Sequence, residues 1–428
     1  MSFDRYIGDN IKTQISQEKP WTDINALTEH LEKSIIPNDK MEEWKYFSTS
    51  KNLKEDWSLA QKKEIQSDIN KEKISKNSIV LVDGVFHSKY SNIDELKGIN
   101  LYSIAEYLNI DPSIKNLIYN NPCKYSEKRV SGKNDINTTS LISLNALFNK
   151  GLVIVIKENT EIKGKINLVN IIKNNNLLVN PYILVLCQEG SSANIVDIRK
   201  YYGEDNWINT CMEIYQYKNA KLLFSTLQSE TKTNISTSSI NFHISKEAFL
   251  SMFVLNRENS KSDIRVFLKE TNAQAKINGI LLSSKRKESD IFCKVEHSSK
   301  KCSSEQNWRL LSADSSTTSV KGKIVVKKNA KGSNGKFYSK SMILGDEAAS
   351  YSKPELEIFE DEVSCNHGAS FGEIDKNLIF YMQSRGISKN EAIKVIIKAF
   401  VNEVISDDKE ILDKYLLEME DFFRRNLK

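Results

Sequence analysis

A short apolar pattern recurs at a nearly constant interval in the middle of the chain. An alanine is followed two residues later by Ile or Leu at four places: Ala193/Ile195, Ala220/Leu222, Ala248/Leu250 and Ala275/Ile277. These alanines are 27, 28 and 27 residues apart. A fixed period of this length indicates a repeated structural unit that stacks on its neighbours. It constrains the fold more strongly than any other feature of the sequence.

Each alanine also follows a run in which apolar residues alternate with others, as at Ile240, Phe242 and Ile244. Such alternation predicts a strand, because successive side chains of a strand point to opposite faces. Two short strands per period fit one rung of a parallel β-helix, in which each small alanine points inward and stacks on its equivalents. An antiparallel sandwich also fits the strand content, and only the period favours the β-helix.

The character of the sequence changes on both sides of this core. Residues 1–78 are polar and carry Ile7, Ile11 and Ile15 at helical spacing, and residues 79–150 mix a short strand at Ile79–Val82 with helical and loop segments. We expect the parallel β-helix over residues 151–358, and a motif strand followed by helices over residues 359–428. The predicted fold class is therefore mainly β, flanked by N-terminal and C-terminal α-helical regions.

The most specific chemistry lies between Cys365 and Gly372. If this segment continues the extended run around Leu356, then Cys365 and His367 point the same way, since they are two residues apart. A thiol beside an imidazole suits zinc, iron or an iron-sulfur species. Gly368 and Gly372 are expected to allow tight turns after this pair.

Helices with readable boundaries are expected after this motif. Asp375 can cap the first of them, and Gly386 falls where a helix end favours a left-handed residue. Ser388 and Glu391 have the spacing of a capping box that opens the second. The predicted apolar faces are Leu378, Ile379, Tyr381 and Met382 on the first helix, and Ile411, Tyr415, Leu416, Met419 and Phe422 on the last.

Cys365 and His367 alone make at most half of a metal site, because structural zinc needs four ligands. No second pair with such spacing exists in the sequence. Cysteine is also commonly buried without any chemical role, so Cys365 is either a ligand or a buried neighbour that shapes the strand.

The remaining histidines carry less information. His30, His87 and His243 have no ligand-type residues at suitable spacing, and we expect packing or surface roles for them. His297 is a second candidate ligand. Cys293 and Cys302 lie near it but match no standard metal spacing, so burial is expected for both.

Composition excludes several functional classes. The chain has 428 residues, with 61 basic against 56 acidic ones, and no stretch combines basic residues with aromatic ones as a nucleic-acid binder would. No apolar run reaches the roughly 20 residues of a membrane span, no signal peptide opens the sequence, and the six cysteines are dispersed, so we expect a cytoplasmic protein. No nucleophile elbow, phosphate-binding loop or HExxH pair occurs, so we expect no enzyme.

Several short motifs together resemble a known family. They are Pro354–Ile358, Glu360–Val363, Cys365–Ala369, Phe380–Tyr381 and Ser384–Ile387, with Glu43–Tyr46, Val82–Phe86 and Leu144–Ala146 upstream. The set is similar to the SufB/SufD family of iron-sulfur cluster assembly scaffolds. Because Gly368 and Ala369 follow His367 where SufB chains usually have Glu-Ala, the resemblance is closer to the SufD branch. Asn366 and Ser370 replace the more usual Ser and Thr.

The resemblance implies a right-handed parallel β-helix between helical ends. It also implies a SufD-type subunit that pairs with SufB through the β-helices and docks the ATPase SufC through its C-terminal helices, with a possible homodimer when alone. A transient iron-sulfur cluster would assemble at the SufB/SufD interface, and none would be held stably by the isolated chain. The histidine that such a subunit contributes corresponds to His367, with Cys365 as its neighbour.

Two other functional classes stay open at this point. A metal-dependent enzyme with a β-helical cleft would need carboxylates or histidines stacked on neighbouring rungs, and the sequence offers no such set. A purely structural partner of SufB would use His367 only for packing.

Overall fold

The computed structural model describes residues 37–38, 40–53, 57–59, 76–93, 95–114, 117, 141, 145, 151–229, 231–257, 259–405 and 409–426. The predicted N-terminal helices, His30, Cys123 and the predicted loop at residues 124–139 lie outside these ranges. The predicted strand at Ile79–Val82 is present as part of β2 (Ser78–Val82).

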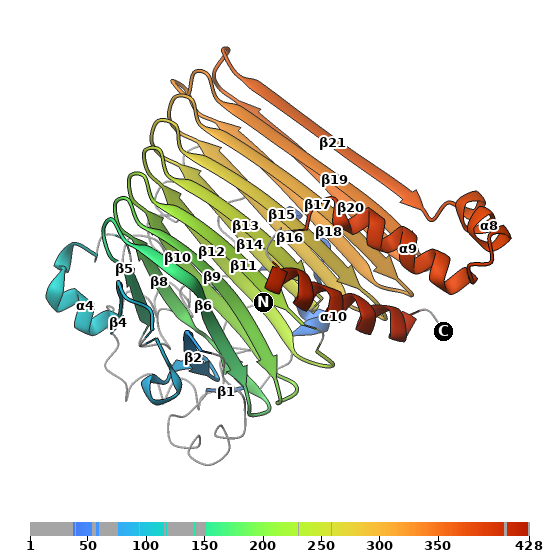
Figure 1. Ribbon diagram of the computed structural model, residues 1–428, viewed down its shortest axis with the longest axis horizontal. Coiled ribbons are helices and arrows are strands. Elements are labelled where there is room, and N and C mark those ends of the chain that lie inside the picture. Colours follow the sequence, from blue (N-terminus) through green and yellow to red (C-terminus); the bar gives the residue numbers. More distant parts are fainter. Residues whose placement is uncertain are drawn as a thin grey trace.

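The centre of the molecule is a solenoid of two long sheets, and Figure 1 shows its strands stacked in sequence order. From β8 onward, strands that are two apart in sequence pair in parallel, so each turn adds one strand to each sheet. The first sheet contains β4 (Ile99–Ser103), β5 (Leu152–Ile156), β8 (Tyr182–Cys187), β10 (Trp207–Gln216), β12 (Ile235–Ile244), β14 (Asn259–Leu268), β16 (Glu288–His297), β18 (Thr317–Val326) and β20 (Ala349–Ile358). The second contains β3 (Val85–Phe86), β2, β6 (Glu161–Ile172), β9 (Ser192–Tyr201), β11 (Lys221–Gln228), β13 (Phe249–Asn256), β15 (Gln274–Ser283), β17 (Ser303–Ala313), β19 (Asn334–Leu344) and β21 (Ser364–Glu373). The predicted parallel β-helix is confirmed, and the antiparallel sandwich is excluded.

The inward alanines do not stack in the predicted way. Ala193 pairs with Leu222, which pairs with Leu250, which in turn pairs with Ala275. Ala220 and Ala248 are buried too, but they lie one residue before β11 and β13. The regularly spaced alanines therefore belong to two separate columns of inward-facing residues. One column lies within the strands, and the other lies at the corners that precede them.

These corners depend on residues in the left-handed region. Asn219, Glu247, Asn272, Lys301 and Asn329 have φ between 57° and 71°. Each directly precedes a small residue that is at most 1% exposed: Ala220, Ala248, Ala273, Cys302 or Ala330. Asn tolerates this conformation better than most residues, and a small side chain fits where the chain turns into the core. The corner is thus a second repeated element.

Two of the three C-terminal helices are fastened to the outer face of the second sheet. Val401 on α9 (Lys389–Asn402) and Tyr415 and Phe422 on α10 (Lys409–Asn426) are buried there against apolar residues such as Phe253 and Leu311. Burial of each such side chain stabilises the docked helix by about 1.5–3 kcal/mol. In the predicted last apolar stripe, only Leu416 stays partly exposed, at 37%.

Two buried arginines reinforce this attachment. The guanidinium of Arg257 is 1% exposed and forms ion pairs with Glu418, at 2.5 Å, and Asp421, at 3.2 Å, both on α10. Arg309 on β17 donates to the Phe400 carbonyl at 3.1 Å and pairs with Glu403 at the end of α9. The end of α9 and the second half of α10 are therefore held to the solenoid by charge as well as by apolar contact.

A segment near the N-terminus crosses the outer face of the first sheet. We call residues 40–53 and 57–59 the N-terminal strap. Glu288 on β16 accepts hydrogen bonds from the Ser48 amide, Lys51 and Asn52 of the strap. Strand β1 (Ser58–Leu59) then pairs with β7 (Leu177–Val179) at the far end of the sheet. The strap thus runs across most strands of this sheet.

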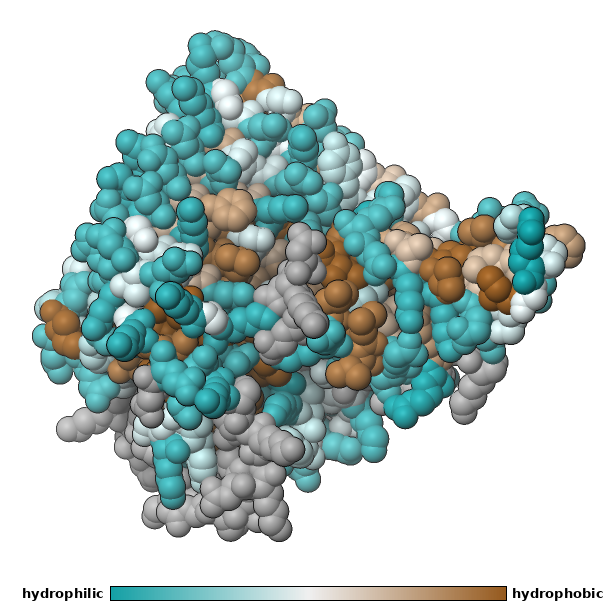
Figure 2. Space-filling model, viewed as in Figure 1, coloured by the Kyte–Doolittle hydropathy of each residue, from teal (hydrophilic) through white to brown (hydrophobic). Residues whose placement is uncertain are grey.

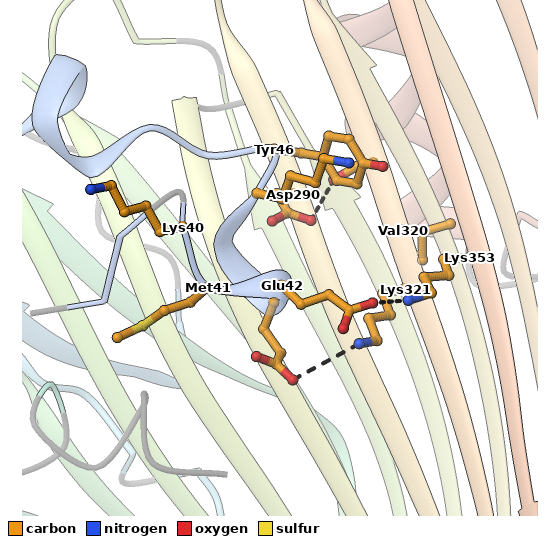
Figure 3. Close-up of a pocket in the computed structure, with 11 residues that line it drawn as sticks. Lys40, Met41, Glu42, Tyr46, Asp290, Val320, Lys321 and Lys353 are labelled. Atoms are coloured by element: carbon orange, nitrogen blue, oxygen red, sulfur yellow. Dashed lines mark hydrogen bonds and ion pairs between the residues drawn. The ribbon is translucent and has the colours of Figure 1, made fainter. Parts of the chain in front are cut away.

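The other end of the strap reaches the last strand. Figure 3 shows Glu42 pointing to Lys353 on β20, with which it forms an ion pair. Glu43 also forms an ion pair, with Lys321 on β18 at 3.9 Å. Tyr46 stacks on Tyr351 of β20. The strap therefore links residues about 300 positions apart in the sequence.

The solenoid ends with β20, a turn at residues 359–363, and β21, which together we call the terminal rung. Among the described residues, β20 pairs only with β18 and β21 only with β19, so each has one open edge. Pro354 lies in β20, and a proline without an N–H is tolerated on an edge strand. The turns expected at Gly368 and Gly372 are wrong: both lie inside β21, because the ladder with β19 continues unbroken from Ser364 to Glu373.

Candidate functional site

The terminal rung brings Cys365 and His367 to the open end of the solenoid. Both lie on β21 and face inward, as the alternation in the sequence predicted. Cys365 ends the column Ala193, Leu222, Leu250, Ala275, Ser304 and Gly335. His367 ends the neighbouring column Ile195, Phe224, Met252, Ile277, Gln306 and Phe337. The repeat that builds the core therefore also aligns the two candidate ligands.

Cys365 is half-buried and packs against the apolar core. It lies over Gly335, where a Cβ atom would come within 3.5 Å of the Cys365 sulfur and 2.9 Å of the Ile324 Cγ2. Burial raises the pKa of the Cys365 thiol above its ordinary value. Since metals bind the thiolate, this environment makes Cys365 a poor ligand until something displaces the proton.

His367 has a different environment although it lies only two residues away. Its side chain is exposed, and it lies above the fully buried ring of Phe337 in the register of the sheet. It makes no hydrogen bond or ion pair with any described residue. An imidazole on an apolar floor, open to solvent on the other side, is available to bind a metal from a neighbouring molecule.

The chain supplies too few ligands to hold a metal by itself at this point. Within the described ranges, no three His, Cys, Asp or Glu side chains gather closely enough to bind an ion. The pair on β21 is thus at most a partial site, which an outside group would have to complete.

His297, the second candidate, lies elsewhere. It is fully buried at the end of β16, and its Nε2 lies 2.8 Å from the Ser304 hydroxyl. Burial lowers the pKa of His297 to about 4, so the ring is neutral at physiological pH. It is packed in the interior on β16, two strands before the last strand of the first sheet, whereas β21 belongs to the second sheet. Cys293 and Cys302 are buried, as predicted.

The packing role expected for His243 is confirmed. The ring is stacked between Tyr215, with ring centroids 4.3 Å apart, and Phe267, at 5.1 Å. Its Nε2 lies 3.0 Å from the fully buried carboxylate of Glu213. Burial lowers the pKa of His243 even though Glu213 opposes this shift. His87, the other described histidine, packs against Tyr90.

A second notable surface lies on the helix that follows β21. Helix α8 (Lys376–Ser384) begins at the predicted cap, because the Asp375 side chain accepts a hydrogen bond from the Asn377 amide at 2.8 Å. None of its residues is buried, and Leu378, Phe380 and Tyr381 are 42%, 73% and 56% exposed. Figure 2 shows apolar side chains gathered at this projecting end of the molecule. Of the predicted apolar face, Ile379 and Met382 are half-buried, whereas Leu378 and Tyr381 stay exposed.

The predicted limits of these helices agree with the structure. Gly386 has φ +86° after α8, and the Ser388 side chain caps α9 by accepting from the Glu391 amide. None of the helices within the described ranges is both long and apolar enough to cross a membrane.

Sequence reasoning did not find the contacts of the N-terminal strap with β20. The Glu43–Tyr46 motif was identified, but nothing in it indicates which strand it touches. In the structure Trp44 is 2% exposed and lies under the ammonium of Lys261, 5.6 Å from the ring centroid. The buried Lys261 also pairs with Asp290 at 2.8 Å. The motif thus anchors the strap to the first sheet.

Comparison with known proteins gives two family matches. Residues 170–400 match the SufBD core domain of the SUF system for FeS cluster assembly. Residues 23–168 match the N-terminal region of SufBD proteins. The first match alone covers more than half of the chain and includes every strand from β8 to β21.

Individual relatives agree with these matches. The chain is 32% identical over 157 residues to the iron-sulfur cluster assembly protein SufD of Escherichia coli, which is 37% of each chain. It is 27% identical over 244 residues to the chloroplastic protein ABCI7 of Arabidopsis thaliana, 55% of this chain and 51% of that one. A SufBD family protein of Synechocystis is 20% identical over 393 residues, 86% of this chain and 83% of the other. The first two matches thus span about a third and a half of those relatives.

Proposed function

Because this chain belongs to the SufBD family of the SUF iron-sulfur cluster assembly system, we propose that it is the SufD-type subunit of the assembly scaffold. In this proposal it pairs with SufB through the terminal rung and docks SufC through its C-terminal helices. His367 provides a ligand to the cluster as it forms. The similarity to Escherichia coli SufD favours the SufD-type role over the SufB-type role.

One observation carries the proposal: His367 is exposed on a strand whose second edge has no partner among the described residues. An open edge can accept a strand from another chain, since its backbone donors and acceptors are unused. Such a partner would come to lie beside the inward-facing pair. The imidazole of this chain and a thiolate of the partner chain would together suit iron.

The cluster is the cargo of this reaction, and the chain's own residues act as an incomplete ligand set. His367 can donate a lone pair to a metal, and no hydrogen bond or ion pair with a described residue has to be broken first. Cys365 would contribute only after losing its proton, which its half-buried position disfavours. We therefore assign His367 as the principal ligand and Cys365 as its neighbour and possible second ligand.

The SufC role is assigned to the exposed apolar side chains of α8, which are Leu378, Phe380 and Tyr381. A cluster of exposed apolar side chains on a projecting helix is typical of a docking surface. Only Ile374 and Asp375 separate β21 from α8. A partner that binds one position of α8 better than another would therefore shift the strand that carries His367.

Co-expression tests the proposal. The chain would be produced anaerobically with SufB and SufC chains of the same SUF system, and the purified assembly analysed for iron and acid-labile sulfide. We expect a stable three-component complex that carries both elements. Failure of a correctly folded chain to associate with SufB would contradict the proposal.

A further inference from the structure

A groove lies where α8 leaves the end of the solenoid. It has a volume of about 790 Å³, and it is lined by α8, the first turns of α9, the end of β21 and the turn at residues 345–348 that joins β19 to β20. Figure 1 shows α8 projecting beyond the end of β21. One wall of the groove therefore belongs to the solenoid and the other to the two helices.

Both walls present apolar side chains to the groove. Ile343 and Leu344 belong to the solenoid, Ile379 and Ile393 belong to the helices, and Ile374 lies in the link from β21 to α8. All five are half-buried, so water still reaches part of each side chain. Bringing the walls together would remove this apolar surface from water, which favours closure of the groove.

The two walls also carry opposite charges. Asp346 on the turn and Glu373 at the end of β21 line the groove together with Lys376 on α8 and Lys389 on α9. All four side chains are exposed, and none of them forms an ion pair with another residue of the described ranges. The acidic groups belong to the solenoid wall and the basic groups to the helical wall, so the walls attract each other.

Helix α8 lacks the packing that a short helix needs. It has 9 residues, and none of them is buried. Helices shorter than about 12–15 residues are marginal in water and owe most of their stability to tertiary packing. Lys376, Ile379 and Gln383 line the groove at helical spacing, whereas Leu378 and Tyr381 do not line it. Closure would therefore pack one face of α8 and leave Leu378 and Tyr381 exposed.

Of the two helices, α8 is the one that is free to move. The buried side chains of Ile397 and Val401 hold α9 to the solenoid. In contrast, α8 is joined to β21 by two residues and to α9 by a turn that contains Gly386, which has φ +86° and no atom within 4 Å of an added Cβ. A few residues at the ends of an element are enough to absorb a hinge motion.

We propose that α8 is a flap that closes over this groove and brings Lys376 to Asp346. Exposed ion pairs and the partial burial of a few side chains each contribute little, so the open and closed positions are both accessible. The flap is a property of the isolated chain and goes beyond the proposed function. Its consequence rests on the proposed function: a partner on the exposed side of α8 would shift the balance between the two positions.

Zero-length cross-linking of the isolated full chain with a carbodiimide tests closure, because the reagent joins a carboxylate only to an amine in contact with it. We expect mass spectrometry to find a peptide that joins Asp346 to Lys376. The exposed ion pair of Lys398 with Glu420, at 2.7 Å, is the positive control. Glu347 is the negative control, because it is next to Asp346 but does not line the groove. Absence of the Asp346 product, or equal reaction of Glu347 with Lys376, would overturn the inference.

Hydrogen exchange provides a second readout. The variant Asp346→Asn/Glu373→Gln removes the acidic groups of the groove, and Glu347→Gln/Asp361→Asn makes the same charge change on exposed residues that do not line it. Amides of residues 376–384 should exchange about threefold faster in the groove variant than in the wild type and the control. Equal exchange in the two variants would overturn the inference. Neither experiment contains SufC, so a failure of SufC to dock would contradict only the proposed function.

Discussion

The ring of Tyr46 on the N-terminal strap stacks on the ring of Tyr351 on β20, with centroids 4.2 Å apart and planes 15° apart. The strap holds the edge strand from its outer face in this way, while Glu42 pairs with Lys353 two residues further along. Since β20 has only β18 as a strand partner among the described residues, the strap supplies a second attachment.

Replacing Tyr46 by Ala should loosen β20. The lost stacking is worth about 1 kcal/mol, so local opening of this strand should become roughly fivefold more frequent. Hydrogen exchange of peptides covering residues 349–358 should accelerate, whereas peptides covering residues 364–373 should keep their rates. Tyr202→Ala, which removes a tyrosine that is 57% exposed, is the control. Unchanged exchange at β20 would show that the stack adds no protection.

Gly322→Ala should destabilise the end of the solenoid. A Cβ atom there would lie 1.9 Å from Cε2 of Phe337, the ring beneath His367 in the register of the sheet. Overpacking of this kind costs about 1–3 kcal/mol, which should lower the thermal unfolding midpoint. Gly372→Ala is a matched control on β21, because a Cβ atom at Gly372 meets nothing within 4 Å. Equal midpoints for the two variants would contradict this packing.

His297 should make the protein less stable as the pH falls. Its pKa is lowered to about 4 by burial in the folded state, whereas an unfolded histidine titrates near 6.5. The unfolded chain therefore takes up a proton first as the pH falls below about 6.5, and stability decreases until the folded pKa is reached, by about 3 kcal/mol in total. Urea unfolding at pH 7.5 and pH 5 should show a smaller loss for His297→Gln than for the wild type. An identical pH dependence would rule out this role of His297.

Phe380→Asp should weaken SufC binding and spare SufB binding. The Phe380 side chain is 73% exposed on α8, so a charge there disrupts docking without disturbing the core. Co-purification should lose at least 90% of SufC while SufB is retained. Leu417→Asp is the control, because Leu417 is 72% exposed on α10. Retention of SufC by the Phe380 variant would remove the basis for this assignment.

The sequence predicted those parts of the fold that depend on neighbouring residues. The alternation that puts Cys365 and His367 on one face is local, and so are the caps at Asp375 and Ser388. The recurrence of two strands per period favoured a parallel solenoid over an antiparallel sandwich, and the family resemblance strengthened that prediction. The family match then agreed with the residues that carried the resemblance.

Other parts depend on contacts that no local pattern records. The regular alanine spacing did not reveal that the alanines belong to two different columns. The number of residues between paired positions varies along the solenoid: it differs between the pair Leu222 and Leu250 and the pair Leu250 and Ala275. Glycines in β21 predicted turns, but the continuous ladder with β19 overrides that preference. The stack of Tyr46 on Tyr351 joins distant segments and could only be found in the folded chain.

The central claim is that His367 contributes a ligand to a cluster completed by a partner. Its most direct test is His367→Ala in the co-expressed SufB and SufC complex, purified anaerobically and analysed for iron and acid-labile sulfide. We predict that the complex assembles in normal proportion and that its iron and sulfide content falls at least tenfold. Wild-type iron and sulfide content in an intact complex would contradict the claim and leave His367 a structural residue.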